Sequence, residues 1–299
     1  MNVIETNALC KRFGRQSVLH DVSFKISAGR IVGFLGPNGA GKTTTIKILT
    51  GLLKASSGDT RIFDLPIRKS GVEIRRQLGY LPGDVHLYGG MKGLAFLRSF
   101  ASARGVDCLD EAKRLADVLN LELHKRIRSF STGMRQKLGL IQALMHKPRL
   151  LILDEPTSAL DPLIRAKVFE ELKKVAADGR TILFSSHSLS EVETLCDEVI
   201  ILRSGKIVEQ QDIEVLRRRA LRKVRAKIES PIDVEKTPDG LRVFESDESS
   251  FVGTWSGKIR ELLRWVEQQP ITDLIIEKPD LNDLFVSYYS ESAGENANV

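Results

Sequence analysis

Two kinds of apolar pattern alternate along this chain. Continuous apolar runs of strand length occur at 30–35, 150–153, 181–184 and 198–202. Between them, amphipathic stretches predict helices at 41–50, 163–177 and 188–195. Strands that are apolar on both faces are typical of a sheet that helices cover on both sides. The pattern therefore predicts an α/β fold.

Two further regions have patterns of their own. Near the start, apolar residues alternate with polar ones, which predicts an antiparallel sheet at the edge of the core. The alternating positions are Val18, Val22, Phe24 and Ile26. Residues 91–147 have helical periodicity almost throughout. We therefore expect a helical insertion within the α/β core.

The C-terminal region contains both strand-like alternation and helical patterns of apolar residues, which together predict a small α+β domain. Its expected strands are 222–229, 241–245 and 271–277, and its expected helices lie near 257–268 and 280–289. We place a boundary near 215. The predicted domains are 1–215, with a helical subdomain at about 84–147, and a C-terminal accessory domain at 216–299.

Composition excludes several classes of protein. With 42% hydrophobic and 28% charged residues over 299 positions, the chain is an ordinary globular protein rather than a disordered one. No apolar run approaches the roughly 20 residues that span a bilayer, and the first residues lack the apolar core of a signal peptide. The three cysteines have no metal-ligand spacing, so we expect reduced thiols and a cytoplasmic protein.

The net charge of +6 is unevenly placed. Residues 1–215 carry the positive excess, and residues 216–299 are slightly acidic. Seven of the eleven residues from 217 to 227 are Lys or Arg. We interpret this basic run as a solvated helix and linker, with anionic lipid headgroups as an alternative ligand.

A glycine-rich segment after the first apolar run fits the pattern GxxxxGK[ST]. It comprises Gly36, Pro37, Asn38, Gly39, Ala40, Gly41, Lys42 and Thr43, followed by Thr44. Glycines let consecutive N–H groups point inward at the positive end of a helix dipole, where they hold phosphate oxygens. Lys42 supplies a charge for the β- and γ-phosphates, and the Thr43 hydroxyl can bind Mg²⁺. The segment predicts a site for a nucleoside triphosphate.

Two acids end the buried run 150–153. The carboxyl ends of parallel strands face the ligand in α/β sheets, so Asp154 is placed to hold Mg²⁺. Glu155, where the chain leaves the strand, is placed to orient and deprotonate the attacking water. His187 follows another apolar run, so a contact to the γ-phosphate and a purely structural role both remain open.

Together with the segment FSTGMRQKL at 130–138, these motifs resemble the ATP-binding cassette (ABC) family over about residues 1–210. The resemblance implies a head-to-tail dimer that sandwiches two Mg-ATP, with Ser131 and Gly133 contacting the γ-phosphate across the interface. It also implies that His187 senses the γ-phosphate and that Asp161 communicates between the sites. Phe13 occupies the position of the family's adenine-stacking aromatic, although an aromatic in the core is the alternative there.

Two segments depart from the family pattern. The signature usually reads LSGGQ, but residues 130–134 read FSTGM, in which Thr132 and Met134 resemble a variant frequent in one exporter branch of the family. In the segment 78–88, Gly83 stands where the family has a glutamine that touches Mg²⁺ and water. Asp84 is the candidate replacement ligand, and contact through the loop backbone alone is the alternative.

The segment 276–285 is similar to an ending common in ABC subunits of two-protein exporters. The resemblance implies an ATPase at the cytoplasmic face of the membrane, working as a homodimer or paired cassette with a separate permease. The region 84–104 would dock that permease, although its apolar residues also suit the subdomain's own core.

The alternative is a soluble ABC ATPase acting on nucleic acid or ribosomes, which the basic pI favours. The single phosphate loop, the missing long heptads and the missing cysteine clusters argue against it, so no nucleic-acid partner is expected.

Overall fold

The computed structural model describes residues 1–219, 221–233 and 237–277. By its internal contacts the chain separates into two compact units, Met1–Gln211 and a second that begins at Asp212. The helix predicted at 280–289 and most of the segment 276–285 lie outside the described residues. Among the residues described, no helix is long and apolar enough to cross a membrane.

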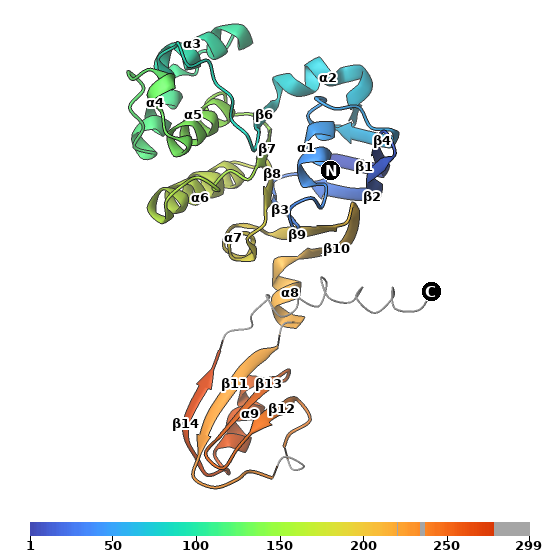
Figure 1. Cartoon of the computed structure of the whole chain (residues 1–299), viewed down its shortest axis with the longest axis vertical. Helices are drawn as coiled ribbons and strands as arrows, with labels where there is room; N and C mark the ends of the chain where they lie inside the picture. Colours follow the sequence, from blue (N-terminus) through green and yellow to red (C-terminus); the bar gives the residue numbers. More distant parts are fainter. Residues whose placement is uncertain (220, 234–236, 278–299) are drawn as a thin grey trace. The chain divides into compact units, whose positions relative to one another are not determined.

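A six-stranded sheet forms the centre of the first unit, with the strand order β10-β9-β3-β8-β7-β6 (Figure 1). Its strands are β3 (Ile31–Leu35), β6 (Leu78–Leu81), β7 (Leu150–Asp154), β8 (Thr181–Ser186), β9 (Glu198–Arg203) and β10 (Lys206–Asp212). β3, β7 and β8 are buried at every residue, and β3 pairs in parallel with β8, as does β7. The predicted α/β core is confirmed.

An antiparallel sheet packs beside this core, in the order β2-β1-β4-β5. Its strands are β1 (Asn2–Phe13), β2 (Gln16–Ser27), β4 (Ser57–Ile62) and β5 (Leu65–Pro66). The two sheets share one apolar core, in which the ring centroids of Phe24 and Phe34 lie 5.8 Å apart. The antiparallel sheet predicted from the alternating pattern at the start of the chain is therefore confirmed.

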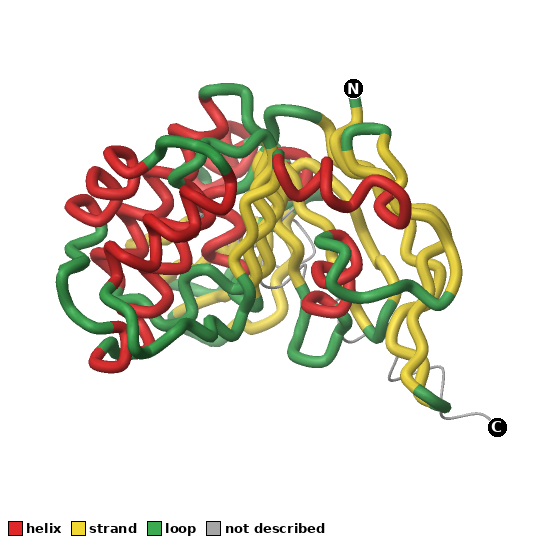
Figure 2. The backbone as a smooth tube through the Cα atoms, turned by 90° about the horizontal axis from the view of Figure 1, so that it is seen from above, coloured by secondary structure: helices red, strands yellow, loops and turns green. Residues whose placement is uncertain are grey.

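The helices of the first unit divide between the two sides of the parallel sheet. They are α1 (Lys42–Leu49), α2 (Ile67–Arg76), α3 (Gly93–Arg104), α4 (Leu109–Val118), α5 (Thr132–Leu144), α6 (Pro162–Ala177) and α7 (Leu189–Leu195), with a 3₁₀ turn at Ile127–Ser129. In Figure 1, α3, α4 and α5 group on the side away from the antiparallel sheet, and in Figure 2 most of the helices (red) lie on one side of the strands (yellow). The helical insertion is confirmed.

In its described residues, the second unit is an antiparallel sheet with one helix, α9, against it. After α8 (Ile213–Arg219), the strands β11 (Arg222–Ile228), β12 (Leu241–Ser246), β13 (Ser250–Trp255) and β14 (Ile271–Ile276) assemble in the order β12-β13-β11-β14. α9 (Ile259–Val266) contributes Leu262 to a core with Phe251 and Trp255. The α+β expectation is confirmed, although β13 had not been predicted.

The strand predicted at 222–229 is confirmed, because residues 222–228 form β11, an inner strand of the sheet. The interpretation of the basic run 217–227 as a helix and linker is therefore wrong for its second half. Val224, Ala226 and Ile228 are buried in the core, while Arg225 and Lys227 alternate with them and are exposed. In this segment, the alternation of apolar and charged residues indicates the strand, and the number of charged residues does not indicate the structure.

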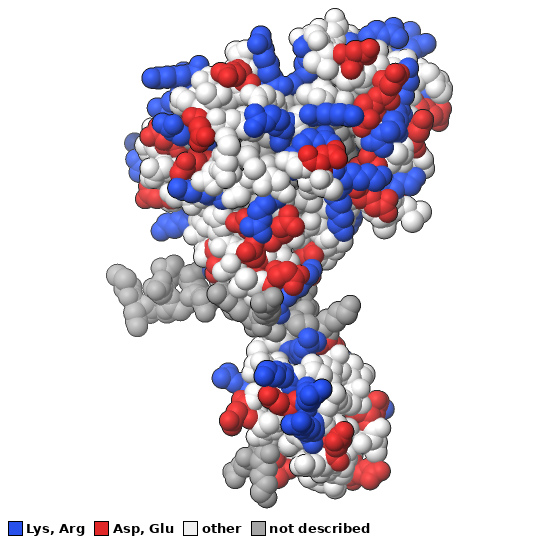
Figure 3. Space-filling model, turned by 180° about the vertical axis from the view of Figure 1, so that it is seen from behind, with Lys and Arg blue, Asp and Glu red and all other residues white. Residues whose placement is uncertain are grey.

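Both signs of charge mix on the surface of the first unit. On the face in Figure 3, Lys and Arg side chains lie among Asp and Glu side chains and form no continuous basic area. On that face, the mild positive excess is spread out rather than gathered into one field.

Leu262 tests the core of the second unit. Leu262→Ala should lower the free energy of unfolding of this unit by about 3 kcal/mol, because it empties a fully buried site. The chain has two tryptophans, Trp255 and Trp265, both in this unit, so their fluorescence in urea reports its unfolding. The neighbouring Leu263 is 41% exposed, and Leu263→Ala should cost less than about 1 kcal/mol. Equal losses would contradict the packing of α9.

Candidate functional site

The phosphate loop runs from the end of β3 to the start of α1. Gly39 and Gly41 have φ values of 81° and 106°, which glycine adopts without strain. At Gly36 the limit is space, because a Cβ atom there would lie 2.3 Å from the carbonyl oxygen of Leu202. The glycines of the motif are thus required by this backbone, and Pro37, Asn38 and Gly39 at the tip are exposed.

Lys42 turns back over this loop. Its Nζ donates to the carbonyl oxygens of Gly36 at 2.6 Å and Pro37 at 3.1 Å, and the residue is 5% exposed. Burial lowers the pKa of Lys42, and the negative charges of Glu155 and Asp154 oppose that shift. A nearly buried amine is therefore held at the concave side of the loop. Beside it, Thr43 is exposed and Thr44 half-buried.

Asp154 ends β7 and is 1% exposed. Its Oδ1 accepts a 2.6 Å hydrogen bond from Ser185 Oγ, but its Oδ2 has no hydrogen-bond partner among the described residues. Burial and the charge of Asp154 raise the pKa of Tyr80 to about 12. A Cβ atom at Gly83 would lie 3.2 Å from Oδ2, so glycine leaves space beside this oxygen. A buried carboxylate oxygen without a donor fits a bound cation.

Glu155 has its backbone in the left-handed region, with φ of 46°. That conformation costs a residue with a Cβ atom about 1–2 kcal/mol. Its Oε1 lies 3.8 Å from Lys42 Nζ and 3.4 Å from His187 Nδ1. The structure thus brings together one residue from the phosphate loop, one from the end of β7 and one from the end of β8.

Four residues after His187 along the chain lies a buried acid that was not predicted from the sequence. Glu191, on α7, accepts hydrogen bonds from Ser186 Oγ at 2.7 Å and from Thr157 Oγ1 at 2.8 Å, and it pairs with Arg165 at 3.4 Å. It therefore links the segments that follow β7 and β8. The one available signal was a glutamate within the amphipathic pattern of 188–195.

The signature segment and the Asp161 turn pack against each other. Ser131 caps α5, and its Oγ accepts a 3.2 Å hydrogen bond from the Met134 amide. A Cβ atom at Gly133 would lie 2.7 Å from the carbonyl oxygen of Ala159, so the two segments are in close contact. Asp161 caps α6, and its hydrogen bonds from the amides of Ile164 and Leu163 lower its pKa. In the part of the chain described, no contact joins Ser131, Gly133 or Asp161 to Lys42.

The remaining two candidates lie at the surface. Phe13, at the end of β1, is 49% exposed, and Lys11 Nζ lies 4.8 Å from its ring centroid. The Asp84 side chain is 86% exposed, and its Oδ2 lies 3.5 Å from Nδ1 of His86. Both side chains are accessible, and neither is in the group around Glu155.

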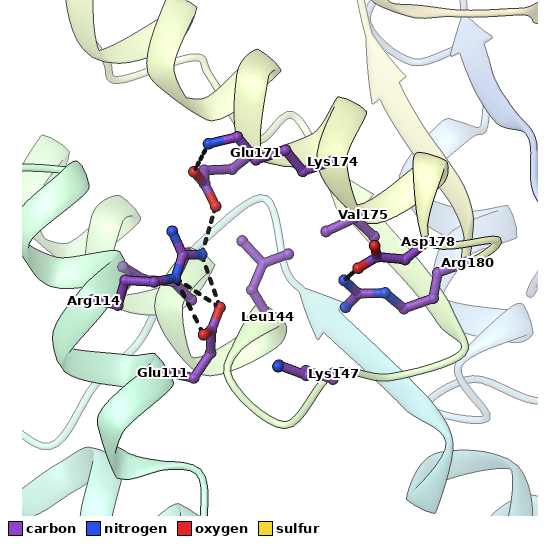
Figure 4. Close-up of a pocket in the computed structure, with 10 residues that line it drawn as sticks. Glu111, Arg114, Leu144, Lys147, Glu171, Lys174, Val175, Asp178 and Arg180 are labelled. Atoms are coloured by element: carbon purple, nitrogen blue, oxygen red, sulfur yellow. Dashed lines mark hydrogen bonds and ion pairs between the residues drawn. The ribbon is translucent and has the colours of Figure 1, made fainter.

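A separate pocket of about 350 Å³ lies between α4 and α6 (Figure 4). Lys147 and Arg180 line it just before β7 and β8 begin, so it lies toward the amino ends of the parallel strands and Asp154 toward their carboxyl ends. Arg114 bridges Glu111 and Glu171 across it. The pair with Glu111 lies within α4, whereas the pair with Glu171 joins α4 to α6. The pocket is not part of the site at Asp154.

Two sequence profiles match parts of this chain. The sequence profile described as "ABC transporter" matches residues 19–158, and a profile described as an AAA domain of a putative AbiEii toxin, type IV toxin–antitoxin system, matches 125–193. The ABC transporter ATP-binding protein YhcH of Bacillus subtilis (strain 168) is 39% identical over 216 residues, 71% of this chain and 70% of that protein. The bacitracin transport ATP-binding protein BcrA of Bacillus licheniformis is 37% identical over 73% of this chain and 72% of its own. The linearmycin resistance ATP-binding protein LnrL of Bacillus subtilis (strain 168) is 33% identical over 69% of this chain and 68% of its own.

The solved structures that resemble this chain are also those of ATP-binding proteins. An ATP-binding subunit of an ABC transporter superposes with a TM-score of 0.66 at 33% identity, over 72% of this chain and 92% of that one. A dimeric ATP-binding cassette in a post-hydrolysis state, bound to ADP and phosphate, has a TM-score of 0.63 over 70% of this chain and 98% of that one. At 22% identity, the second likeness establishes the shared fold alone.

Proposed function

Because the chain belongs to the ABC transporter family as an ATP-binding subunit, we propose that it powers an exporter whose membrane permease is a separate chain. As a member of this family it binds ATP and is an ATPase. Export is supported by the relatives named for bacitracin transport and linearmycin resistance and by the FSTGM form of the signature segment. The protein would then work at the cytoplasmic face of the membrane, attached through the permease.

The convergence of Lys42 and His187 on one oxygen of Glu155 carries the catalytic part of the proposal. In it, the N–H groups of the loop hold the phosphates, and Lys42 exchanges the carbonyl oxygens of Gly36 and Pro37 for phosphate oxygens. Glu155 then accepts a proton of the water that attacks the γ-phosphorus, while the bond from this phosphorus to the β-phosphate oxygen breaks and ADP leaves. His187 holds the γ-phosphate and Glu155 in the attack geometry.

The carboxylate oxygen without a hydrogen-bond donor at the end of β7 is suited to bind a magnesium ion. Oδ2 of Asp154 is buried without a donor, and the exposed Thr43 hydroxyl is the second protein ligand in the proposal. Bound there, Mg²⁺ would neutralise charge on the phosphates. Gly83 supplies no side chain, so we assign the missing ligand to the accessible carboxylate of Asp84.

Dimerisation completes the site in this proposal. Ser131 and Gly133, at the start of α5, would contact the γ-phosphate held by the partner subunit, as an anion at a helix N-terminus. Asp161 would carry the signal between the two sites, and Phe13 would stack on the adenine. The exposure of Ser131 and Phe13 is what such contacts require.

The permease would dock on the segment before α3 and on α3 itself. Of the apolar residues in this region, Tyr88 is 75% exposed, whereas Leu97 is completely buried in the helical insertion. Tyr88 is therefore available to a partner helix, and Leu97 serves the core.

The central test of this function is Glu155→Gln. It should bind ATP but hydrolyse it at least about a hundredfold more slowly, because the proton acceptor is gone. Saturating Mg-ATP should convert the variant to a dimer in sedimentation velocity. Lys42→Ala is the control and should remain a monomer without bound ATP. A monomeric Glu155→Gln protein at saturating Mg-ATP would rule out the sandwich for this chain.

Asp84→Ala tests the replacement ligand. The magnesium concentration for half-maximal ATPase activity should rise about tenfold, because one carboxylate near the ion is lost. Asp107→Ala removes an exposed acid outside the site and should leave that concentration unchanged. If Asp84→Ala behaves like this control, Asp84 does not replace the glutamine.

A further inference from the structure

The main chain of Glu155 is held at both of its hydrogen-bonding groups by side chains outside the proposed reaction. Its amide donates to Ser185 Oγ at 3.0 Å, and its carbonyl oxygen accepts from Gln136 Nε2 at 3.1 Å. We propose that Ser185 and Gln136 are positioning residues that clamp Glu155 in its left-handed conformation and so aim its carboxylate. This inference rests on the proposed function, because it takes Glu155 as the proton acceptor.

The position of Ser185 in the sheet allows its hydroxyl to bond to both Asp154 and Glu155. β7 and β8 run parallel, and Asp154 is the register partner of Ser185. The Ser185 hydroxyl is completely buried, donates to Asp154 Oδ1 at 2.6 Å and accepts from the Glu155 amide. One hydroxyl therefore uses both its donor and an acceptor position to connect the two acids.

Gln136 reaches the carbonyl group of Glu155, on the other side of its Cα atom, from a helix. It lies on α5, one turn after the N-cap Ser131, and is 3% exposed. The carbonyl oxygen of Glu155 also accepts from Ser158, through its Oγ at 3.1 Å and its amide at 3.3 Å. Ser158 belongs to the turn that Glu155 itself begins, whereas Gln136 ties that turn to the signature helix.

The left-handed backbone explains why such a clamp is needed. A glutamate released from these bonds relaxes to negative φ, which redirects its side chain. Oε1 would then leave the positions 3.8 Å from Lys42 Nζ and 3.4 Å from His187 Nδ1. Neither Ser185 nor Gln136 contacts the phosphate loop in the described residues, so loss of the clamp should reduce the rate of hydrolysis without reducing ATP affinity.

Ser185→Thr and Ser185→Val form the first test. These variants have the same shape and differ by one hydroxyl, so strain from the added methyl groups cancels between them. The kcat of Ser185→Val should be about tenfold below that of Ser185→Thr, with equal KM for ATP. Thr181→Val makes the same hydroxyl loss at the other end of β8, where Thr181 Oγ1 accepts from the Gly29 amide, and should leave kcat unchanged. Equal kcat values for the two Ser185 variants would overturn the role of Ser185.

Gln136→Met is the second test, because methionine keeps the length of the side chain and removes its N–H donor. Its kcat should fall about tenfold at unchanged KM. The half-buried Gln142 lies on the same helix, and Gln142→Met should retain the full kcat. A Gln136→Met protein that retains full kcat, or loses rate only through a raised KM, would overturn the role of Gln136.

A double-mutant cycle separates the clamp from the proposed function. In single-turnover assays, Gln136→Met should slow the wild-type protein but have no further effect on Glu155→Gln, since a residue that acts through Glu155 has nothing left to position. Equal slowing in both backgrounds would overturn the clamp while Glu155 remains the proton acceptor. Wild-type rates in Glu155→Gln alone would instead overturn the assignment of Glu155.

Discussion

The burial of a carboxylate at the carboxyl edge of a parallel sheet is the constraint on which the rest of the site depends. Asp154 is almost fully buried, and one of its two oxygens has a donor in the described structure. An isolated charge in such a place is costly, so cations must gather around it. Lys42 and the proposed magnesium ion meet this need. The order of the strands places the loop after β3 and the serine at the end of β8 near the same edge.

Sequence reasoning reached the parts of this site that come from short motifs. The phosphate loop, the two acids after 150–153 and His187 each follow an apolar run, and parallel pairing gathers the ends of such runs. It missed Glu191 and the bonds of Gln136 and Ser185, because these depend on which side chains face each other across elements. Ser185 meets Asp154 through the register of β7 and β8, 31 residues apart along the chain.

In the second unit, the periodicity of apolar residues predicted the secondary structure better than the density of basic residues did. Val224 and Ala226 identify a strand inside a segment whose seven basic residues suggested a linker. β13 was missed because Gly253 interrupts the apolar positions on its buried face, yet Phe251 and Trp255 on that face anchor it in the core. Burial on one face is enough to form a strand in a sheet with a helix on that side.

A crystal structure of the Glu155→Gln protein with Mg-ATP is the decisive measurement for this site. We expect the triphosphate in the loop 36–43, with Lys42 Nζ bonded to phosphate oxygens instead of the carbonyl oxygens of Gly36 and Pro37. We also expect the metal ion beside Oδ2 of Asp154. A nucleotide bound elsewhere, or a Lys42 that still donates to Gly36 while ATP is bound, would contradict the proposed site.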